Sequence, residues 1–325
     1  MMEDIQGACL VKRVHVKDLA PRIGFPPVST GRLEDVLKNR PFVLQVGPSS
    51  VALRGRVDLD GWRLGVAYHQ FTRPAHQPQL SLAVKYEPTT LPRGNLIFQV
   101  GELASFYRDG KLVIIRLGEE TTPSRADRVV TLDASALTGT LVVDVDHSTK
   151  PAASYPLQYP LEDLLFRSLL ADRGALIVHG CGVVWQGKGY LFVGSSGVGK
   201  STTARLWKAA GASVLNDDRV VLEFSTAWTS IHPTPWSGEY SEVGGRAATL
   251  AAIYLLKKGQ DVVYESLRPS VAGALLFAKS FPPLWDPQRI GSVLEIIDRV
   301  CRAVPIGWLQ VPPDQRAVEW VQRHG

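Results

Sequence analysis

The stretch "LFVGSSGVGKSTTARLW", residues 191–207, decides the fold of the second half of the chain. Within it, "GSSGVGKS" at residues 194–201 matches the phosphate-binding pattern G-x-x-x-x-G-K-[ST]. An apolar run precedes this glycine loop, and a segment of helical character, residues 200–211, follows it and ends at a glycine. Strand, glycine loop and helix in this order are the context that the pattern requires, so we expect the loop to bind phosphate groups.

Each part of the glycine loop has an expected role. The glycines let backbone N–H groups turn towards the β-phosphate, and the helix directs its positive N-terminal end at the same anion. We expect Lys200 to reach the β- and γ-phosphates, Ser201 to supply a hydroxyl to Mg²⁺, and Thr202 to contact the α-phosphate. The expected cofactors are ATP and Mg²⁺. The predicted nucleotide-binding residues are Gly194, Ser195, Ser196, Gly197, Val198, Gly199, Lys200, Ser201 and Thr202.

Two adjacent acidic residues, Asp217 and Asp218, follow the helix and the short apolar strand "SVLN". This strand should run parallel to "YLFV" before the loop, which places both aspartates at the same sheet edge as the phosphates. One carboxylate there is needed to hold Mg²⁺. The other is available to accept a proton from an incoming hydroxyl. Alternatively, one aspartate only caps the turn into "RVVLEF", but this role does not account for both.

His179 ends the apolar stretch "ALIVH" upstream of the loop. A lone histidine in such a stretch commonly packs in a core. If this strand lies next to "YLFV" or "SVLN", the imidazole instead reaches the sheet edge, hydrogen-bonds Asp217, orients it and changes its pKa. Both interpretations stay open at this point.

The first half of the chain is predicted to be β-rich, and the second half α/β. The polar segment 147–156, rich in Pro, Ala and Ser, marks the expected boundary, so the 325 residues divide into 1–155 and 156–325. Residues 157–174 then have helical apolar spacing and end at a glycine. The predicted strands of the first half are residues 41–47, 50–59, 62–71, 80–87, 95–101, 111–118 and 140–146.

Composition narrows the classes of function. The formal charge of +5 is spread over both halves without a Lys/Arg block, so nucleic acid is not an expected partner. Cys9, Cys181 and Cys301 are far apart and show no zinc-ligand spacing, which favours a reducing compartment and no structural metal. No apolar run approaches the ~20 residues of a membrane span. We therefore expect a cytoplasmic protein that does not bind membranes, with homo-oligomerisation left open.

Taken together, "HG" before a pair of β-strands, "GSSGVGKST" and "NDDRV" resemble the catalytic domain of HPr kinase/phosphorylase, a family related to phosphoenolpyruvate carboxykinase. The resemblance covers residues 161–224. The later segments "TPWSGE" and "FPPLWD" are more similar to HPr-kinase-like proteins from bacterial peptide-modification gene clusters, some of which phosphorylate a serine of a precursor peptide. The resemblance implies a P-loop kinase domain in which Asp217 acts as the base, paired with His179, and Asp218 helps to hold Mg²⁺.

The chain also departs from that family. The family's C-terminal signature is matched only loosely by "EVGGRAATLAAIYLL", which argues against HPr itself as the substrate. The β-rich first half does not match the family's usual first domain. Glu239 or Glu242 is a candidate second metal-side carboxylate, although a solvated loop position is the simpler expectation for each. Trp236 and Trp285 are expected to pack in a core rather than to contact a ligand.

The leading hypothesis is an ATP-dependent kinase that acts on a serine-type hydroxyl of a peptide, a protein or a small molecule. The alternative is a nucleotide-binding regulator that senses ATP without transfer, but a sensor has no need of the second carboxylate. A carboxykinase is not supported, because no arginine cluster for a carboxylate substrate is recognisable. A phosphorylase or phosphatase back-reaction stays open, since the same carboxylate could activate phosphate or water.

Overall fold

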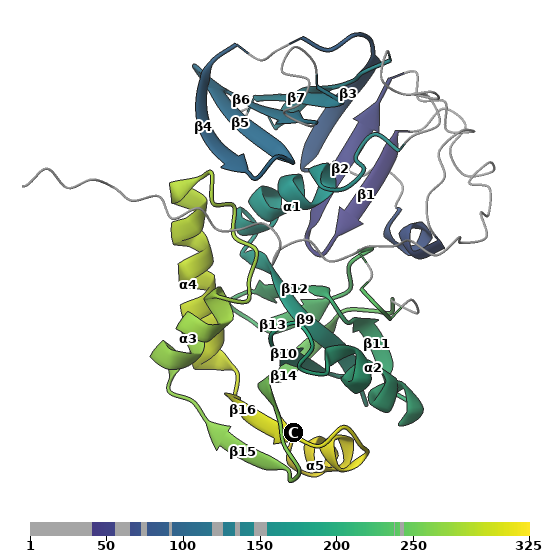
Figure 1. Ribbon diagram of the computed structural model, residues 1–325, viewed down its shortest axis with the longest axis vertical. Coiled ribbons are helices and arrows are strands. Elements are labelled where there is room, and N and C mark those ends of the chain that lie inside the picture. Colours follow the sequence, from purple (N-terminus) through teal and green to yellow (C-terminus); the bar gives the residue numbers. More distant parts are fainter. Residues whose placement is uncertain are drawn as a thin grey trace, which may run out of the picture.

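The chain folds into a mixed α/β structure with two large sheets, seen in a computed structural model (Figure 1). The predictions on Cys9 and Glu242, most of the predicted boundary segment 147–156, and residues 56–59, 62–65 and 146 of the predicted strands lie outside the described residues. The structure describes residues 41–55, 66–72, 77–90, 93–118, 126–133, 137–145, 155–236, 238–240 and 244–325.

The first sheet has eight strands in the order β1-β2-β3-β8-β7-β6-β5-β4. The pairs β2–β3 and β3–β8 are parallel, and the other neighbours are antiparallel. Its strands are β1 (Phe42–Val46), β2 (Ser49–Arg54), β3 (Leu80–Tyr86), β4 (Asn95–Val100), β5 (Ala104–Asp109), β6 (Leu112–Leu117), β7 (Arg128–Asp133) and β8 (Thr138–Val143).

All but one of the strands predicted for this half are confirmed. The exception is residues 62–71: their described part, Val66–Phe71, is the 3₁₀ helix η3. In this helix Phe71 packs into the core and Tyr68 donates a hydrogen bond to Glu162. Its apolar side chains therefore do not alternate between two faces as they would in a strand. Strands β5 and β7 were not predicted, since polar residues interrupt their apolar runs and only pairing with β6 reveals them.

The second sheet also has eight strands, in the order β10-β9-β12-β13-β14-β16-β15, with β11 paired to β9 beside this path. A further parallel pairing joins β10 to β14. Its strands are β9 (Ala175–Trp185), β10 (Lys188–Val193), β11 (Ser213–Asn216), β12 (Arg219–Phe224), β13 (Thr229–His232), β14 (Ala248–Lys258), β15 (Val263–Ser266) and β16 (Ile306–Val311).

Strands β10 and β11 run in the same direction, as predicted, but they are not neighbours. Strand β9 lies between them and is antiparallel to both. The last residue of β10, Val193, pairs with Gly180, and the last residue of β11, Asn216, pairs with Gly182. The ends of both strands therefore reach the edge where His179 lies, and a functional site can form there.

Helices cover both faces of the second sheet (Figure 1). Trp207 of α2 and Val321 of α5 belong to one buried cluster, whereas Leu276 of α3 and Ile297 of α4 belong to another. None of the described helices is long and apolar enough to cross a membrane. The helices are α1 (Leu161–Ala171), α2 (Lys200–Ala209), α3 (Pro269–Phe277), α4 (Pro287–Ala303) and α5 (Arg316–His324).

One hydrophobic core joins the first sheet, helix α1 and the second sheet. It contains Phe106 from β5, Phe166 from α1 and Val221 from β12. The predicted core packing of the two tryptophans is confirmed: Trp236 and Trp285 are buried here, and Trp285 stacks on Phe106 with ring centroids 4.2 Å apart. The division at residues 155 and 156 stays a prediction, and apolar packing extends across it.

Candidate active site

The glycine loop, residues 194–199, connects β10 to α2, and two of its glycines have backbone angles that side chains rarely adopt. Gly197 has φ +75° and Gly199 has φ +119°, and a Cβ at either position would meet nothing within 4 Å. The requirement is therefore conformational. A Cβ at Gly194, by contrast, would lie 2.6 Å from Cγ1 of Val198. Because no side chain caps α2, its first N–H groups are available at this loop, where Ser195 and Ser196 are exposed.

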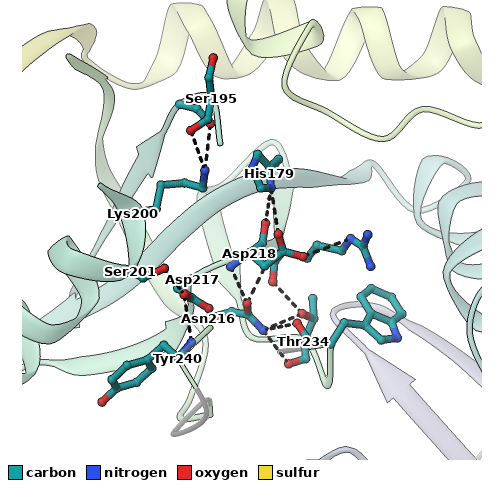
Figure 2. A network of polar contacts seen from close by, with 12 residues as sticks. His179, Ser195, Lys200, Ser201, Asn216, Asp217, Asp218, Thr234 and Tyr240 are labelled. Atoms are coloured by element: carbon teal, nitrogen blue, oxygen red, sulfur yellow. Dashed lines mark hydrogen bonds and ion pairs between the residues drawn. The ribbon is translucent and has the colours of Figure 1, made fainter. Parts of the chain in front are cut away.

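Lys200 begins α2 and folds back over the loop. Its Nζ donates hydrogen bonds to the backbone oxygens of Gly194 and Ser195, each at 3.1 Å (Figure 2). Burial lowers the pKa of Lys200, while the nearby Asp218 and Asp217 act in the opposite direction. The lysine is thus held at the loop, where an anionic ligand would offset its desolvation.

A second lysine, Lys279, reaches the same loop from the segment after α3. Its Nζ donates to Oγ of Ser195 at 3.0 Å. The segment is tied to β9, because the backbone N–H of His179 donates to the oxygen of Lys279 at 2.7 Å and that of Phe281 donates to Ile177 at 2.9 Å. No motif in the sequence marks Lys279, so its position at the loop follows only from this long-range pairing.

Asp217 faces helix α2. Its Oδ2 accepts a hydrogen bond from Oγ of Ser201 at 2.7 Å and another from the backbone N–H of Tyr240 at 3.1 Å (Figure 2). Its Oδ1 is buried and has no hydrogen-bond partner among the described residues. Burial raises the pKa of Asp217, against the effect of these hydrogen bonds. A buried carboxylate oxygen without a donor, beside a hydroxyl, suits a hard cation such as Mg²⁺.

Asp218 faces the opposite way, towards β9. The Nδ1 atom of His179 lies 3.1 Å from Oδ1 of Asp218 and 3.0 Å from its backbone oxygen, so this nitrogen is the donor (Figure 2). Nε of Arg219 lies 3.6 Å from Oδ2. Burial by itself would raise the pKa of Asp218, but the His179 hydrogen bond and the Arg219 charge hold this pKa below its usual value.

The prediction that His179 hydrogen-bonds Asp217 is therefore wrong, because the imidazole bonds Asp218 instead. The chain turns at the end of β11, and the two successive side chains leave it in different directions. Adjacent residues in extended chain point to opposite sides. The sequence places both aspartates at the edge, but it does not say which of them faces β9.

Asn216 fixes this turn, and sequence reasoning missed it although it adjoins the aspartates. Its side chain is fully buried. Oδ1 accepts the backbone N–H of Asp218 at 2.8 Å and that of Arg219 at 3.1 Å. Nδ2 donates to Oγ1 of Thr234 at 3.1 Å and to the oxygen of Trp236 at 2.8 Å. The amide thus binds the aspartate turn to the segment after β13 (Figure 2).

The remaining predicted residues lie on or beside the loop. Val198 and Thr202 line a pocket next to α2. Glu239 is exposed. Among the described residues, no three His, Cys, Asp or Glu side chains gather as a ligand set. A magnesium ion bound with a nucleotide needs only one or two carboxylates, because phosphates and water supply the other ligands.

Comparisons with known proteins find distant structural neighbours among the solved structures. No family model matches the sequence, and no curated protein matches it. The solved structure of the HPr(Ser) kinase/phosphatase from Coxiella burnetii is 11% identical, covers 46% of this chain and 99% of its own length, and has a TM-score of 0.28. A likeness at this level says nothing about what this chain binds or transfers.

Proposed function

We propose that the chain is an ATP-dependent kinase that transfers the γ-phosphate to a serine-type hydroxyl of a peptide, a protein or a small molecule. The observation that carries this proposal is the pair of carboxylates with separate partners at one sheet edge. Asp217 is bonded to Ser201 of the glycine loop, and Asp218 is bonded to His179. Binding a nucleotide alone would need only the first of these arrangements.

In this proposal, the glycine loop and Lys200 bind the β- and γ-phosphates. Ser201 and Asp217 would hold Mg²⁺, since a hydroxyl lies there beside a buried carboxylate oxygen that has no donor among the described residues. The ion, when bound, neutralises charge on the phosphate oxygens. Lys279, hydrogen-bonded to Ser195, adds a second positive charge at the loop. These groups hold and polarise the phosphoryl group that is to be transferred.

Asp218 is the proposed proton acceptor. The hydroxyl oxygen of the acceptor attacks the γ-phosphorus, the bond to the bridging oxygen breaks, and ADP leaves while the hydroxyl proton passes to Asp218. His179 donates to the carboxylate and so fixes its orientation. The roles of the two aspartates are then exchanged relative to the family resemblance, in which Asp217 is the base and Asp218 the metal-side residue.

Two amide variants test these roles. Asp218→Asn should leave Mg·ATP affinity nearly unchanged and slow transfer by about 10²- to 10⁴-fold, the usual contribution of a general base. Asp217→Asn should instead weaken Mg·ATP binding, and added Mg²⁺ should partly restore it. His179→Ala should resemble a milder Asp218→Asn. Asp298→Asn, on the exposed surface of α4, is the matched control and should behave as the parent.

The measurements are titration calorimetry with Mg·ATP and single-turnover transfer of label from ATP to serine-containing peptides, with water as the reference acceptor. A slow Asp217→Asn protein with normal Mg·ATP affinity, beside an Asp218→Asn protein that needs more Mg²⁺, would restore the order that the resemblance implies. A parent protein that binds Mg·ATP but transfers no label to any acceptor, water included, would favour the regulatory alternative.

A further inference from the structure

A pocket of about 290 Å³ opens beside the glycine loop, on the side of α2 away from the aspartates' hydrogen-bond network. Its floor includes loop residues 197–199 and the side chains of Thr202 and Thr203 from the first turn of α2. The ends of β14 and β16 and the start of α5 form the other walls. Segments far apart in the sequence thus converge on one hollow that continues directly from the loop.

The direction of a bound triphosphate links this pocket to the loop. Lys279 and Ser195 mark one end of the loop, and Thr202 lies at the other, one residue beyond Ser201. If the terminal phosphate lies at the end where transfer occurs, the α-phosphate lies near Thr202. Whatever is esterified to the α-phosphate must then continue past Thr202, and Thr202 lines the pocket.

The lining of the pocket is mostly apolar. The apolar residues that line it include Phe192, Leu206, Trp207, Leu309, Pro312 and Val318. The polar side chains among the lining residues are Thr202, Thr203 and Lys258. Apolar walls with a few polar groups suit an aromatic heterocycle attached to a sugar.

The walls are also held in place. Trp207 of α2 stacks on Tyr190 of β10 with ring centroids 5.8 Å apart, and Val318 of α5 belongs to the same buried cluster. The ends of the two strands are joined, because the backbone N–H of Gly259 donates to the oxygen of Val311 at 3.1 Å. These contacts within the protein fix the positions of the walls on both sides of the pocket.

We infer that this pocket binds the nucleoside part of the substrate, with a purine base between the α2 and α5 walls and its ribose beside Thr202. The inference rests on the proposed function, because it takes the phosphates of that nucleotide to lie on the glycine loop. It assigns a role to α5, which contributes nothing to the phosphate site.

Filling the pocket tests the inference. Ala317 lines it from α5 and is half-buried, so Ala317→Phe should occupy the space of the base. Mg·ATP affinity should fall about tenfold or more, while affinity for magnesium tripolyphosphate, which has no nucleoside, should not change. Ala303→Phe, at an exposed helical alanine of α4, is the matched control and should affect neither ligand. Circular dichroism checks the fold of each variant.

A milder substitution gives a second readout. Alkylation of Ala317→Cys should be slowed by Mg·ATP but not by magnesium tripolyphosphate, and alkylation of Ala303→Cys should be slowed by neither. Normal ATP affinity in a folded Ala317→Phe protein, or absence of protection at position 317, would overturn the pocket assignment and leave the phosphate site standing. A parent protein that binds neither ATP nor tripolyphosphate would instead overturn the proposed function.

Discussion

At the scale of single residues, the two lysines that contact the glycine loop should differ in their effect on nucleotide binding. Lys200 bonds the backbone of Gly194 and Ser195, whereas Lys279 donates to the Ser195 hydroxyl. In the proposed function, this hydroxyl lies at the terminal-phosphate end of the loop. Lys200→Ala should therefore weaken both ATP and ADP binding, since in the proposed function the lost charge faces the β- and γ-phosphates. Lys279→Ala should weaken ATP binding more than ADP binding. Titration calorimetry with both nucleotides measures the difference.

Lys258→Ala is a control for loss of one lysine, because Lys258 lines the pocket proposed for the base and is not bonded to the glycine loop in any contact seen among the described residues. Any loss of affinity in this variant should be equal for ATP and ADP. Equal losses of ATP and ADP affinity in Lys279→Ala would contradict a contact with the γ-phosphate.

A second prediction at this scale concerns Asn216. Replacing it with Ala leaves the backbone N–H groups of Asp218 and Arg219 and the oxygen of Trp236 without their partner in a buried site. The free energy of unfolding should fall by about 3 kcal/mol or more, because three groups lose their partner and each buried group left unpaired costs about 1–3 kcal/mol. Urea unfolding measures it, with the exposed Asn95→Ala as control. A loss no larger than that of the control would show that the turn does not depend on the amide.

The sequence predicts which residue types lie at this site, but not which side chains contact one another. The spacing of the glycine loop names Lys200 and Ser201, because backbone conformation and phosphate geometry demand those types at those positions. It also places Asp217 and Asp218 at one edge. It could not reveal the partner of His179 or the role of Lys279, since both depend on side-chain direction and on contacts between distant segments.

At the scale of elements, helix α1 begins with a buried acidic residue that ties three segments together. Tyr68 of η3 donates to Glu162, and Nε1 of Trp236 donates to its Oε1 at 2.7 Å. Burial raises the pKa of Glu162 to about 8, against the effect of those two hydrogen bonds. At neutral pH the folded protein therefore keeps a proton that the unfolded chain releases.

This difference predicts a dependence of stability on pH. Below the ordinary pKa of Glu162 both states are protonated, so its contribution is fully present. As the pH rises towards about 8, only the unfolded chain releases the proton, and the free energy of unfolding should fall by a few kcal/mol. In Glu162→Gln the amide oxygen still accepts from Tyr68 and Trp236 but does not titrate, so the decline should shrink.

The measurement is urea unfolding of both proteins at several pH values between about 5 and 8. Glu295→Gln is the control, because Glu295 is an exposed residue of α4. A decline in Glu162→Gln as steep as that of the parent would show that other groups cause the pH dependence.

The elements that the sequence predicted best are those that are determined locally. The turn between β9 and β10 and the end of α2 just before Gly211, which has φ +85°, follow from glycines at positions that require them. The direction of β11 was also predictable from a crossover through α2. The insertion of β9 between β10 and β11 was not, because it depends on which edge the preceding strand occupies.

At the scale of the whole molecule, the sequence predicts two parts but not how far they share a core. The polar segment near residue 150 marks a change of composition, which is a local property. The packing of Trp285 on Phe106 joins residues that are distant in the chain, and neither has a sequence signal for the other. The shared core raises the question of whether the two sheets unfold together.

We predict a single unfolding transition, in which a cavity in the first sheet destabilises the second. Phe106 is fully buried, so Phe106→Ala should lower the free energy of unfolding by about 3–5 kcal/mol. Of the 8 tryptophans, all but Trp62 lie beyond residue 155, so their fluorescence reports on the second part. Its midpoint in urea should shift together with that of far-UV circular dichroism, which reports on both sheets.

Leu96→Ala, at a half-exposed position of β4, is the control and should shift neither midpoint by much. Saturating Mg·ATP should raise both midpoints in the parent, because a ligand stabilises the whole of a cooperative unit to which it binds. If circular dichroism of Phe106→Ala instead shows an early step while the fluorescence midpoint stays at the parent value, the first sheet unfolds alone. The packing of Trp285 on Phe106 would then be a docking contact between two independent domains, and residues 156–325 would hold the nucleotide site by themselves.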